Sequence, residues 1–573
     1  MWQSNVNYGY HRGIKKEFLQ DFCNPPALYR GKPFWAWNGR LDPEELRWQV
    51  RIMQRMGLGG FFMHSRIGLD TEYLSDEWHT CIEACIDEAR ALGLEAWLYD
   101  EDRWPSGSGG GIVTADKRYR MKYLEMVETT NGGRQRLPGR RVARFVAEVK
   151  GSTATKVRRM RPGDRSRCQP GEVYLDFQVR EAPKSSWYNG ETYLDTLDHA
   201  SVKAFIKSTH EEYRRRFGRD FGGTVPGMFT DEPNHGGYFN EMQWTSRGNS
   251  VPWTTKLPAV FRRRYGYDIL DHLPELFLDV DGDGVTPARH NFHDCTTFLF
   301  ADAFGRQIGE WCDRTGMIHT GHILAEQTTS SQTWVVGSCM RFYEHMQAPG
   351  MDLLTQYWRE YDTAKQVSSA ARQFGKKWRL TETYGCTGWD FPFAGHKAIG
   401  DWQAAMGINL RCQHLSWYTM LGPAKRDYPA SIFYQSPWWD SYHVVEDYFG
   451  RVHAAMTRGV EIRDLLVIHP IESMWVQCRR DWWGNEYLPK RNITAFDDKL
   501  PLVRDALLGA NIDFDYGDED ILSRHGKVSS GGSSPSLIVG KARYRAVLVP
   551  PLVTMRETTL RLLKRFRNAG GCV

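Results

Sequence analysis

Short apolar runs alternate with amphipathic runs over most of the first 450 residues. Stretches such as residues 75–92 and 201–217 carry apolar positions at helical spacing, and Asp42 with Glu45 has the spacing of a helix N-terminal cap. The apolar runs of strand length are residues 32–38, 57–65, 94–99, 224–230, 317–324, 351–356, 378–381 and 408–415, of which 351–356 is the weakest. Eight strands with intervening helices predict a (β/α)8 TIM barrel.

Two segments depart from this pattern. Residues 126–190 alternate Val, Arg, Phe and Thr with Gly and Pro, which predicts a small β-rich insertion. From residue 460 onward, apolar strands at 464–469 and 545–549 alternate with helices at 499–510 and 558–568. The predicted organisation is therefore a catalytic barrel over residues 1–459 and a doubly wound α/β domain over 460–573. This second domain is expected to be truncated, because the chain stops where its next strand should begin.

Carboxylates follow the predicted barrel strands directly. The strand ends and the loops after them form the active-site face of such a barrel. The residues are Asp100, Glu101 and Asp102 after the third strand, Asp231 and Glu232 after the fourth, Glu326 after the fifth and Glu382 after the seventh. Any one of these carboxylates could equally form a salt bridge or a helix cap. Four groups of them on one rim favour instead the pair of carboxyl groups that glycosidic cleavage needs.

Glu232 is the leading candidate for the general acid. Met228 and Phe229 precede it, and apolar surroundings raise a carboxyl pKa toward the range of an acid catalyst. Glu382 is assigned the second catalytic role because its strand lies across the barrel mouth from that of Glu232. Glu326 is an alternative base or a ligand for a hard cation.

Aromatic residues make up 13% of the chain, with 22 Trp, and several stand beside carboxylates. An aromatic face covers the apolar face of a pyranose while polar groups bond its hydroxyls. Packing in the core is the alternative for each Trp. The glycine-rich segment 106–111 is interpreted as a flexible loop at the mouth. The predicted substrate-binding residues are Asp100, Glu101, Asp102, Arg103, Trp104, Asp231, His64, Trp37, Asn38, His322, Glu326, Tyr384, Trp389 and Trp417.

Composition excludes several classes of protein. The net charge is +5, with 74 basic and 69 acidic residues interspersed, so no nucleic-acid partner is expected. No run of 18 apolar residues and no signal-like N-terminus occur, which predicts a soluble, cytoplasmic enzyme of bacterial type without a membrane partner. Eleven unpatterned Cys indicate reduced thiols and no zinc site. A homo-oligomer is compatible with these data.

Four motifs together resemble the barrel of glycoside hydrolase family 106, the α-L-rhamnosidase-like enzymes, over about residues 30–450. They are PFWAWNGRLDPEEL (33–46), GLGGFFMHSRIGL (57–69), EAWLYDEDRWPSG (95–107) and MFTDEP (228–233). The resemblance implies an exo-acting, inverting α-L-rhamnosidase in which calcium helps to hold the sugar. By motif position, the acid is Glu232 in FTDEP and the base is Glu382 in LTETYG. No cofactor is otherwise required, and no calcium site matches residue by residue.

The segment from residue 460 is similar to the flavodoxin-like domain of family 42 β-galactosidases, which are retaining enzymes. The chain is also shorter than typical family 106 members and lacks their β-sandwich regions. Glu382 is therefore either a base or a nucleophile, and the substrate is an oligosaccharide or glycoside ending in rhamnose.

Other functions remain open at this stage. The sugar is alternatively a galactoside, arabinoside or uronide, and a non-enzymatic alternative is an inactive sugar-binding barrel. A metal-dependent amidohydrolase on the same fold usually needs a His-x-His pair, which the sequence lacks.

Overall fold

A ring of parallel strands forms the centre of the computed structural model, which describes residues 16–129, 138–161, 163–164, 168–236, 249–282, 284–478, 495–529 and 535–573. The strands are β1 (Phe34–Trp37), β2 (Gly60–Ser65), β3 (Glu95–Tyr99), β8 (Gly227–Asp231), β11 (Ile318–His322), β12 (Ala348–Leu353), β13 (Leu380–Thr383), β14 (Leu410–Gln413) and β15 (Ser416–Trp417). β14 pairs with β13, and β15, two residues further on, pairs with β1, so this last segment closes the ring. The predicted (β/α)8 barrel is confirmed.

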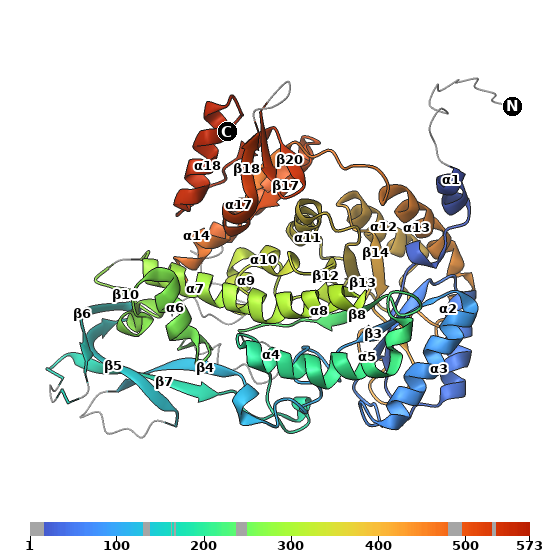
Figure 1. The fold of residues 1–573 in the computed structure, drawn as a ribbon, viewed down its shortest axis with the longest axis horizontal. Coiled ribbons are helices and arrows are strands. Elements are labelled where there is room, and N and C mark those ends of the chain that lie inside the picture. Colours follow the sequence, from blue (N-terminus) through green and yellow to red (C-terminus); the bar gives the residue numbers. More distant parts are fainter. Residues whose placement is uncertain are drawn as a thin grey trace.

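Helices cover the outside of the ring (Figure 1). The helix α2 (Pro43–Arg55) begins as its sequence predicts, because the Asp42 carboxylate accepts the N–H groups of Glu44 and Glu45. The helix α3 (Asp76–Leu92) ends at Gly93, whose φ of 70° suits glycine. The others are α1 (Lys16–Cys23), α4 (His199–Phe205), α5 (Glu211–Phe217), α6 (Leu257–Tyr265), α7 (Pro287–Phe300), α8 (Gln307–Thr315), α9 (Thr329–Val335), α10 (Cys339–Tyr343), α11 (Tyr361–Phe374), α12 (Phe393–Ala405) and α13 (His443–Met456).

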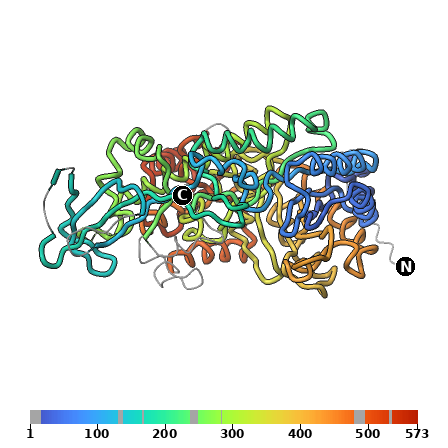
Figure 2. Tube along the Cα trace, turned by 90° about the horizontal axis from the view of Figure 1, so that it is seen from below, coloured from blue at the N-terminus to red at the C-terminus, as the bar shows by residue number. Residues whose placement is uncertain are grey.

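A β-sheet projects from one end of the barrel (Figures 1 and 2). Its strand order is β10-β6-β5-β7-β4-β9. Four strands come from the predicted insertion: β4 (Lys122–Thr129), β5 (Arg140–Lys150), β6 (Thr153–Met160) and β7 (Glu172–Glu181). The remaining two, β9 (Ser250–Trp253) and β10 (Asp279–Val280), come from the segment between β8 and β11. The sheet thus starts before residue 126 and needs two later strands, which are too short to give an alternating pattern in the sequence.

The C-terminal part contains a parallel sheet in the order β17-β16-β21, with the first strand in the centre as in doubly wound folds. These strands are β16 (Leu465–Ile468), β17 (Phe514–Gly517) and β21 (Ala546–Leu548). An antiparallel sheet of β18 (Gly526–Ser529), β19 (Ser536–Val539) and β20 (Ala542–Tyr544) is added, which the sequence did not predict. The helices are α14 (Ile471–Trp475), α16 (Lys499–Gly509), α17 (Glu519–His525) and α18 (Glu557–Asn568).

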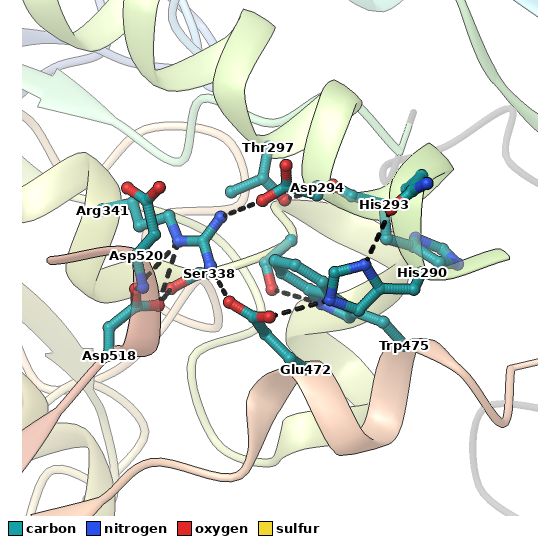
Figure 3. A network of polar contacts seen from close by, with 12 residues as sticks. His290, His293, Asp294, Thr297, Ser338, Arg341, Glu472, Trp475, Asp518 and Asp520 are labelled. Carbon is teal, nitrogen blue, oxygen red and sulfur yellow. Dashed lines mark hydrogen bonds and ion pairs between the residues drawn. The ribbon is translucent and has the colours of Figure 1, made fainter. Parts of the chain in front are cut away.

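A buried arginine joins this C-terminal part to the barrel (Figure 3). Arg341, on α10, pairs with Asp518 (3.0 Å), Glu472 (2.5 Å) and Asp294 (2.8 Å), of which only Asp294 belongs to the barrel helices. Arg556 pairs with the same Glu472 and Asp294. Breaking a buried ion pair is strongly destabilising because it leaves a charge uncompensated. The network therefore fixes α10 relative to the C-terminal sheet.

Among the described residues, no helix combines the length and the apolar character that crossing a membrane requires. Residues 1–15, on which the expectation about a signal sequence rests, lie outside the described part. All eleven cysteines are unpaired thiols, as the sequence predicts.

Gly321 allows β8 and β11 to approach closely. Its φ is +115°, and a Cβ atom there would lie 1.9 Å from the carbonyl O of Thr230. We expect Gly321→Ala to lower the free energy of unfolding by about 3 kcal/mol or more, since it combines a left-handed backbone with a backbone clash. Thermal or denaturant unfolding measures this change.

Gly316 is the matched control for this variant. It ends the helix before β11 with a φ of +72°, and a Cβ there meets no atom within 4 Å. Gly316→Ala should cost only about 1 kcal/mol, the price of the left-handed backbone alone. Equal losses in the two variants would show that the close approach at Gly321 is unimportant.

Candidate active site

A single histidine lies between two carboxylates at the C-terminal end of the barrel. His322 ends β11, and its Nε2 lies 2.9 Å from Glu382 Oε2 and 3.3 Å from Asp231 Oδ1. Its Nδ1 faces the carbonyl O of Ile323 at 3.4 Å, so both ring nitrogens face acceptors. Burial alone would lower the pKa of His322, but the hydrogen bonds to Asp231 and Glu382 raise it well above the usual value. The site therefore holds an imidazolium at neutral pH.

Glu232 follows Asp231 at the end of β8 in a left-handed conformation, with a φ of +47°. Its side chain is buried, and its Oε2 has no hydrogen-bond partner among the described residues. Burial, together with the negative charges of Asp231, Glu382 and Glu326, raises the pKa of Glu232 well above its usual value. A carboxyl group that keeps its proton at neutral pH is the form that a general acid needs.

Asp352 is a further carboxylate of this cluster that the sequence did not reveal. It lies on β12 in register with Glu382 on β13. One oxygen of Asp352, one oxygen of Glu232 and a ring nitrogen of His322 lie within 4.8 Å of one another. The Oδ1 atom of Asp352 also has no partner in the described part of the chain. Glu232 and Asp352 thus present free carboxyl oxygens around the same imidazole.

Glu326 lies behind Asp352 and holds it in place. Its Oε2 accepts the backbone N–H of Asp352 (3.2 Å), and its Oε1 accepts the hydroxyl of Tyr343 on α10. Burial raises the pKa of Glu326 to about 7. With both oxygens occupied, Glu326 acts here as a support of the strand end.

The opposite side of the mouth carries a cation and aromatic rings. Arg66 follows β2, is 3% exposed, and pairs with both carboxylate oxygens of Asp427 at 3.2 Å. Its guanidinium lies 4.3 Å from the ring centre of Trp104 and 5.7 Å from that of Trp417. Burial and the charge of Arg66 lower the pKa of His64, which is therefore neutral. Of these residues, His64, Trp104 and Trp417 were predicted, whereas Arg66 was not.

Several predicted substrate-binding residues have their polar groups occupied within the protein. Asp100 accepts the hydroxyls of Ser106 (2.5 Å) and Thr230 (2.6 Å), and Asn38 bonds the backbone of Thr419. Tyr384 is fully buried, and its hydroxyl lies 3.3 Å from the carbonyl O of His396.

Trp37 also belongs to the core, where its ring packs on Trp35 and Trp78. Successive residues at a strand end point to opposite faces of the sheet. Position in the sequence alone therefore does not show which of them face the mouth and which face the core. Trp389 differs from these buried residues, because it is 36% exposed and its Nε1 donates to the carbonyl O of Lys425.

Asp102 and Arg103 connect the barrel to the segment beside the inserted sheet. Asp102 accepts the hydroxyl of Ser65 (2.8 Å) and the amide of Asn189 (3.0 Å), and Arg103 pairs with Asp102 (3.1 Å). The ring of Trp104 meets that of Trp187 edge-on at 4.9 Å. These contacts fix the loop that carries Trp104 beside the mouth.

Glu101 organises the glycine-rich loop from inside. Its carboxylate accepts the backbone N–H groups of Asp102, Gly107, Gly109 and Gly110. The loop is therefore wrapped around a buried carboxyl group, whose pKa burial raises to about 7, and is not the unconstrained segment that its composition suggested. Glycines 107 and 109–111 all have positive φ values, which turn successive N–H groups toward one centre.

Among the residues that the structure describes, two groups of side chains have the spacing of metal ligands: Asp231, His322 and Glu382, and Glu232, His322 and Asp352. Both contain His322, whereas calcium takes oxygen ligands. The hydrogen bonds of His322 also favour its protonated form, which cannot bind a metal. These groups therefore do not fit the calcium ion that the sequence resemblance implies.

The comparisons with known proteins agree with the barrel. No known family profile matches the chain. A Formosa agariphila protein named "Putative beta-glucuronidase" is 20% identical over 525 residues, which cover 79% of this chain and 42% of that protein. The chain thus spans less than half the length of this relative.

Solved structures of glycosidases have a similar fold. The rhamnosidase from Novosphingobium sp. PP1Y matches with a TM-score of 0.67 and 14% identity, over 97% of this chain and 69% of that one. The β-galactosidase from Halorubrum lacusprofundi matches with a TM-score of 0.53 and 12% identity, over 93% of this chain and 71% of that one. At these identities the likeness establishes the fold.

Glu101 provides a test of the loop. Glu101→Gln replaces one acceptor oxygen by an NH2 group that faces backbone N–H donors, so we expect a loss of about 1–3 kcal/mol in the free energy of unfolding. Limited proteolysis should also cut the loop 102–111 faster. The exposed Asp70 on the preceding loop is the control, and Asp70→Asn should change neither quantity. An unchanged cleavage rate in Glu101→Gln would contradict the bracing role.

Proposed function

We propose that this protein is a glycoside hydrolase that removes a terminal sugar, with Glu232 as the general acid. The observation that carries the proposal is the difference in environment between Glu232 and Glu382. Glu232 is buried among negative charges without a hydrogen bond to Oε2, which keeps it protonated. Burial also raises the pKa of Glu382, but the hydrogen bond and positive charge of His322 oppose that rise. One neutral and one charged carboxyl are what glycosidic cleavage requires.

Glu382 then acts as the base or as the nucleophile. Its position in LTETYG and the resemblance to family 106 support a base that activates water. The similarity of the C-terminal segment to retaining enzymes supports a nucleophile. We adopt the base, because the family 106 motifs cover the catalytic barrel itself.

The sugar is proposed to be an α-L-rhamnoside. The sequence motifs and the fold likeness to a rhamnosidase support it, while the names of the other similar proteins point to glucuronides and galactosides. The charge of the mouth argues against a uronide. Asp231, Glu232, Glu326, Asp352 and Glu382 surround His322, and Arg66 is already paired with Asp427. Among the described residues of the mouth, a sugar carboxylate would find both cations already paired, His322 with Asp231 and Glu382 and Arg66 with Asp427, whereas the hydroxyls of a neutral sugar can bond the carboxyl groups. A panel of nitrophenyl glycosides tests this order of preference.

Glu232→Gln should keep the fold and lower turnover on substrates with poor leaving groups by at least about a hundredfold, as expected for the loss of a general acid. Substrates with very acidic leaving groups should lose much less. Because the acid must be protonated, wild-type activity should fall as pH rises through the raised pKa of Glu232. This alkaline limb of the kcat/KM profile should be missing in the variant when activated substrates are used.

Glu95, at the opposite end of the barrel, is the control for Glu232. Glu95→Gln keeps an oxygen for the indole N–H of Trp97 (2.9 Å) but removes the charge that faces the buried Lys32 (3.5 Å). Activity is therefore compared for equal amounts of folded protein, and the alkaline limb should stay in place. Equal losses of Glu232→Gln on good and poor leaving groups would remove the acid assignment and favour an inactive or differently organised barrel.

The role of Glu382 is decided by stereochemistry. Glu382→Ala should lower turnover at least about a hundredfold. The anomeric proton of the first product, followed by NMR in the wild-type protein, should show inversion if Glu382 activates water and retention if it is a nucleophile. Activity at the wild-type level in Glu382→Ala would exclude both roles and transfer the search to Asp352 or Asp231.

A further inference from the structure

Three neighbouring loops form a continuous rim on one side of the barrel mouth. The loop after β12 is joined to the loop after β13 by a hydrogen bond from the Thr355 N–H to the carbonyl O of Gly385 (2.7 Å). The loop after β13 is joined to the loop after β15 by the bond from Trp389 Nε1 to the carbonyl O of Lys425 (3.0 Å). All three follow the C-terminal ends of barrel strands, the end at which Asp352 and Glu382 lie.

This rim exposes large aromatic side chains. Tyr357 is 79% exposed, Trp358 is 54% exposed, and Trp389 is 36% exposed. Gln356 and Arg359, on either side of the first two, are exposed as well. An aromatic face covers the apolar face of a pyranose, and amide and guanidinium groups bond its hydroxyls. Two adjacent exposed rings beside such groups have the chemistry of a carbohydrate platform.

The rim lies beside both proposed catalytic carboxyl groups, because its second loop follows β13, the strand of Glu382. The loop that carries Tyr357 and Trp358 begins directly after Leu353, the end of β12, and Asp352 on that strand has an oxygen within 4.8 Å of one of Glu232. The terminal sugar occupies the pocket between the carboxyl groups, so the part of the chain that leaves with the protonated oxygen extends outward past the exposed rim. The wall of Arg66 and Trp104 comes from the loops after β2 and β3, and it meets this rim where Arg66 pairs with Asp427 of the loop after β15.

We propose that Tyr357 and Trp358 bind the sugar units that follow the cleaved bond. The substrate is then an oligosaccharide or polysaccharide chain with a terminal sugar to be removed, and not a glycoside of a small non-sugar group. The position relative to the cleaved bond rests on the proposed glycosidase function. The binding of a carbohydrate chain to the rim does not depend on turnover.

The double variant Tyr357→Ala, Trp358→Ala tests the platform in a comparison of two substrates. Both carry the terminal sugar that the nitrophenyl panel selects: one is a glycosyl fluoride, which has no leaving sugar, and the other is an oligosaccharide. We expect kcat/KM to fall roughly tenfold or more on the oligosaccharide, with no change on the fluoride. Equal losses on both substrates, or no loss on either, would overturn the proposal.

Trp48 is the matched control. It is 40% exposed on α2, on the outer wall of the barrel, and packs on Tyr434 at 5.0 Å. Trp48→Ala should leave kcat/KM on both substrates unchanged. An equal loss on the oligosaccharide in this variant would show that removal of any exposed Trp has the same effect, and would overturn the assignment to the rim.

A binding measurement separates the platform from the proposed catalysis. Wild-type protein should be retarded in native gels that contain a soluble polysaccharide with terminal rhamnose units, and the double variant should not. Retardation that depends on the two aromatics, in a protein without turnover of any glycoside, would support the platform while the glycosidase proposal fails. The opposite outcome is turnover of the fluoride without retardation in the gel, and with equal kcat/KM of the wild type and the double variant on the oligosaccharide. It would support the glycosidase proposal and contradict the platform. A self-association that light scattering detects and that the double variant abolishes would assign the rim to a second copy and overturn the proposal.

Discussion

The site depends on the charge of His322. The barrel brings carboxyl groups from β8, β12 and β13 to one point, and two like charges 4 Å apart repel each other by about 4 kcal/mol at an effective dielectric constant of 20. A protonated His322 compensates Asp231 and Glu382 through its hydrogen bonds. Its charge also lowers the pKa of Glu232 and Asp352, but burial outweighs this effect, so the pKa values of these two stay well above their usual values. One imidazolium among four carboxyls thus bonds two of them, Asp231 and Glu382, and leaves Glu232 and Asp352 without that hydrogen bond.

The position of His322 is set by the backbone around it. Gly321 lets β11 lie against the carbonyl of Thr230 on β8, the strand that supplies Asp231 and Glu232. From the other side, the C-terminal part fixes α10 through Arg341, and Tyr343 on the same helix bonds Glu326, which holds the backbone of Asp352. The ion pairs of Figure 3 are therefore connected to the catalytic mouth through one short helix. The C-terminal part thus stabilises the position of Asp352 at the barrel mouth, although none of its described residues supplies a side chain to that cluster.

The barrel could be predicted because each of its buried strands appears in the sequence as a run of apolar residues of about the same length. Asp231, Glu232, His322 and Glu382 were found for the same reason, since each lies at the end of such a run. Asp352 does not follow the predicted strand, because Pro349 and Gly350 weaken the start of β12 and the apolar run at 351–356 contains Asp352. Arg66 was missed because its partner Asp427 is 361 residues away. Trp37 and Tyr384 show the converse error, in which a strand-end residue faces the core.

The two walls of the mouth constrain the substrate differently. On the side of β8 to β13, Glu232 and Asp352 each present a carboxyl oxygen that has no partner in the described part of the chain and can bond a substrate hydroxyl. On the side of β2 and β3, Arg66 is neutralised by Asp427 and presents its flat guanidinium between Trp104 and Trp417. Because its charge is neutralised by Asp427, a guanidinium stacked on indole rings contacts a substrate mainly through its flat face. A neutral sugar with one apolar face satisfies both walls at once, and the absence of a polar group at C6 in a deoxy sugar such as rhamnose suits the aromatic side.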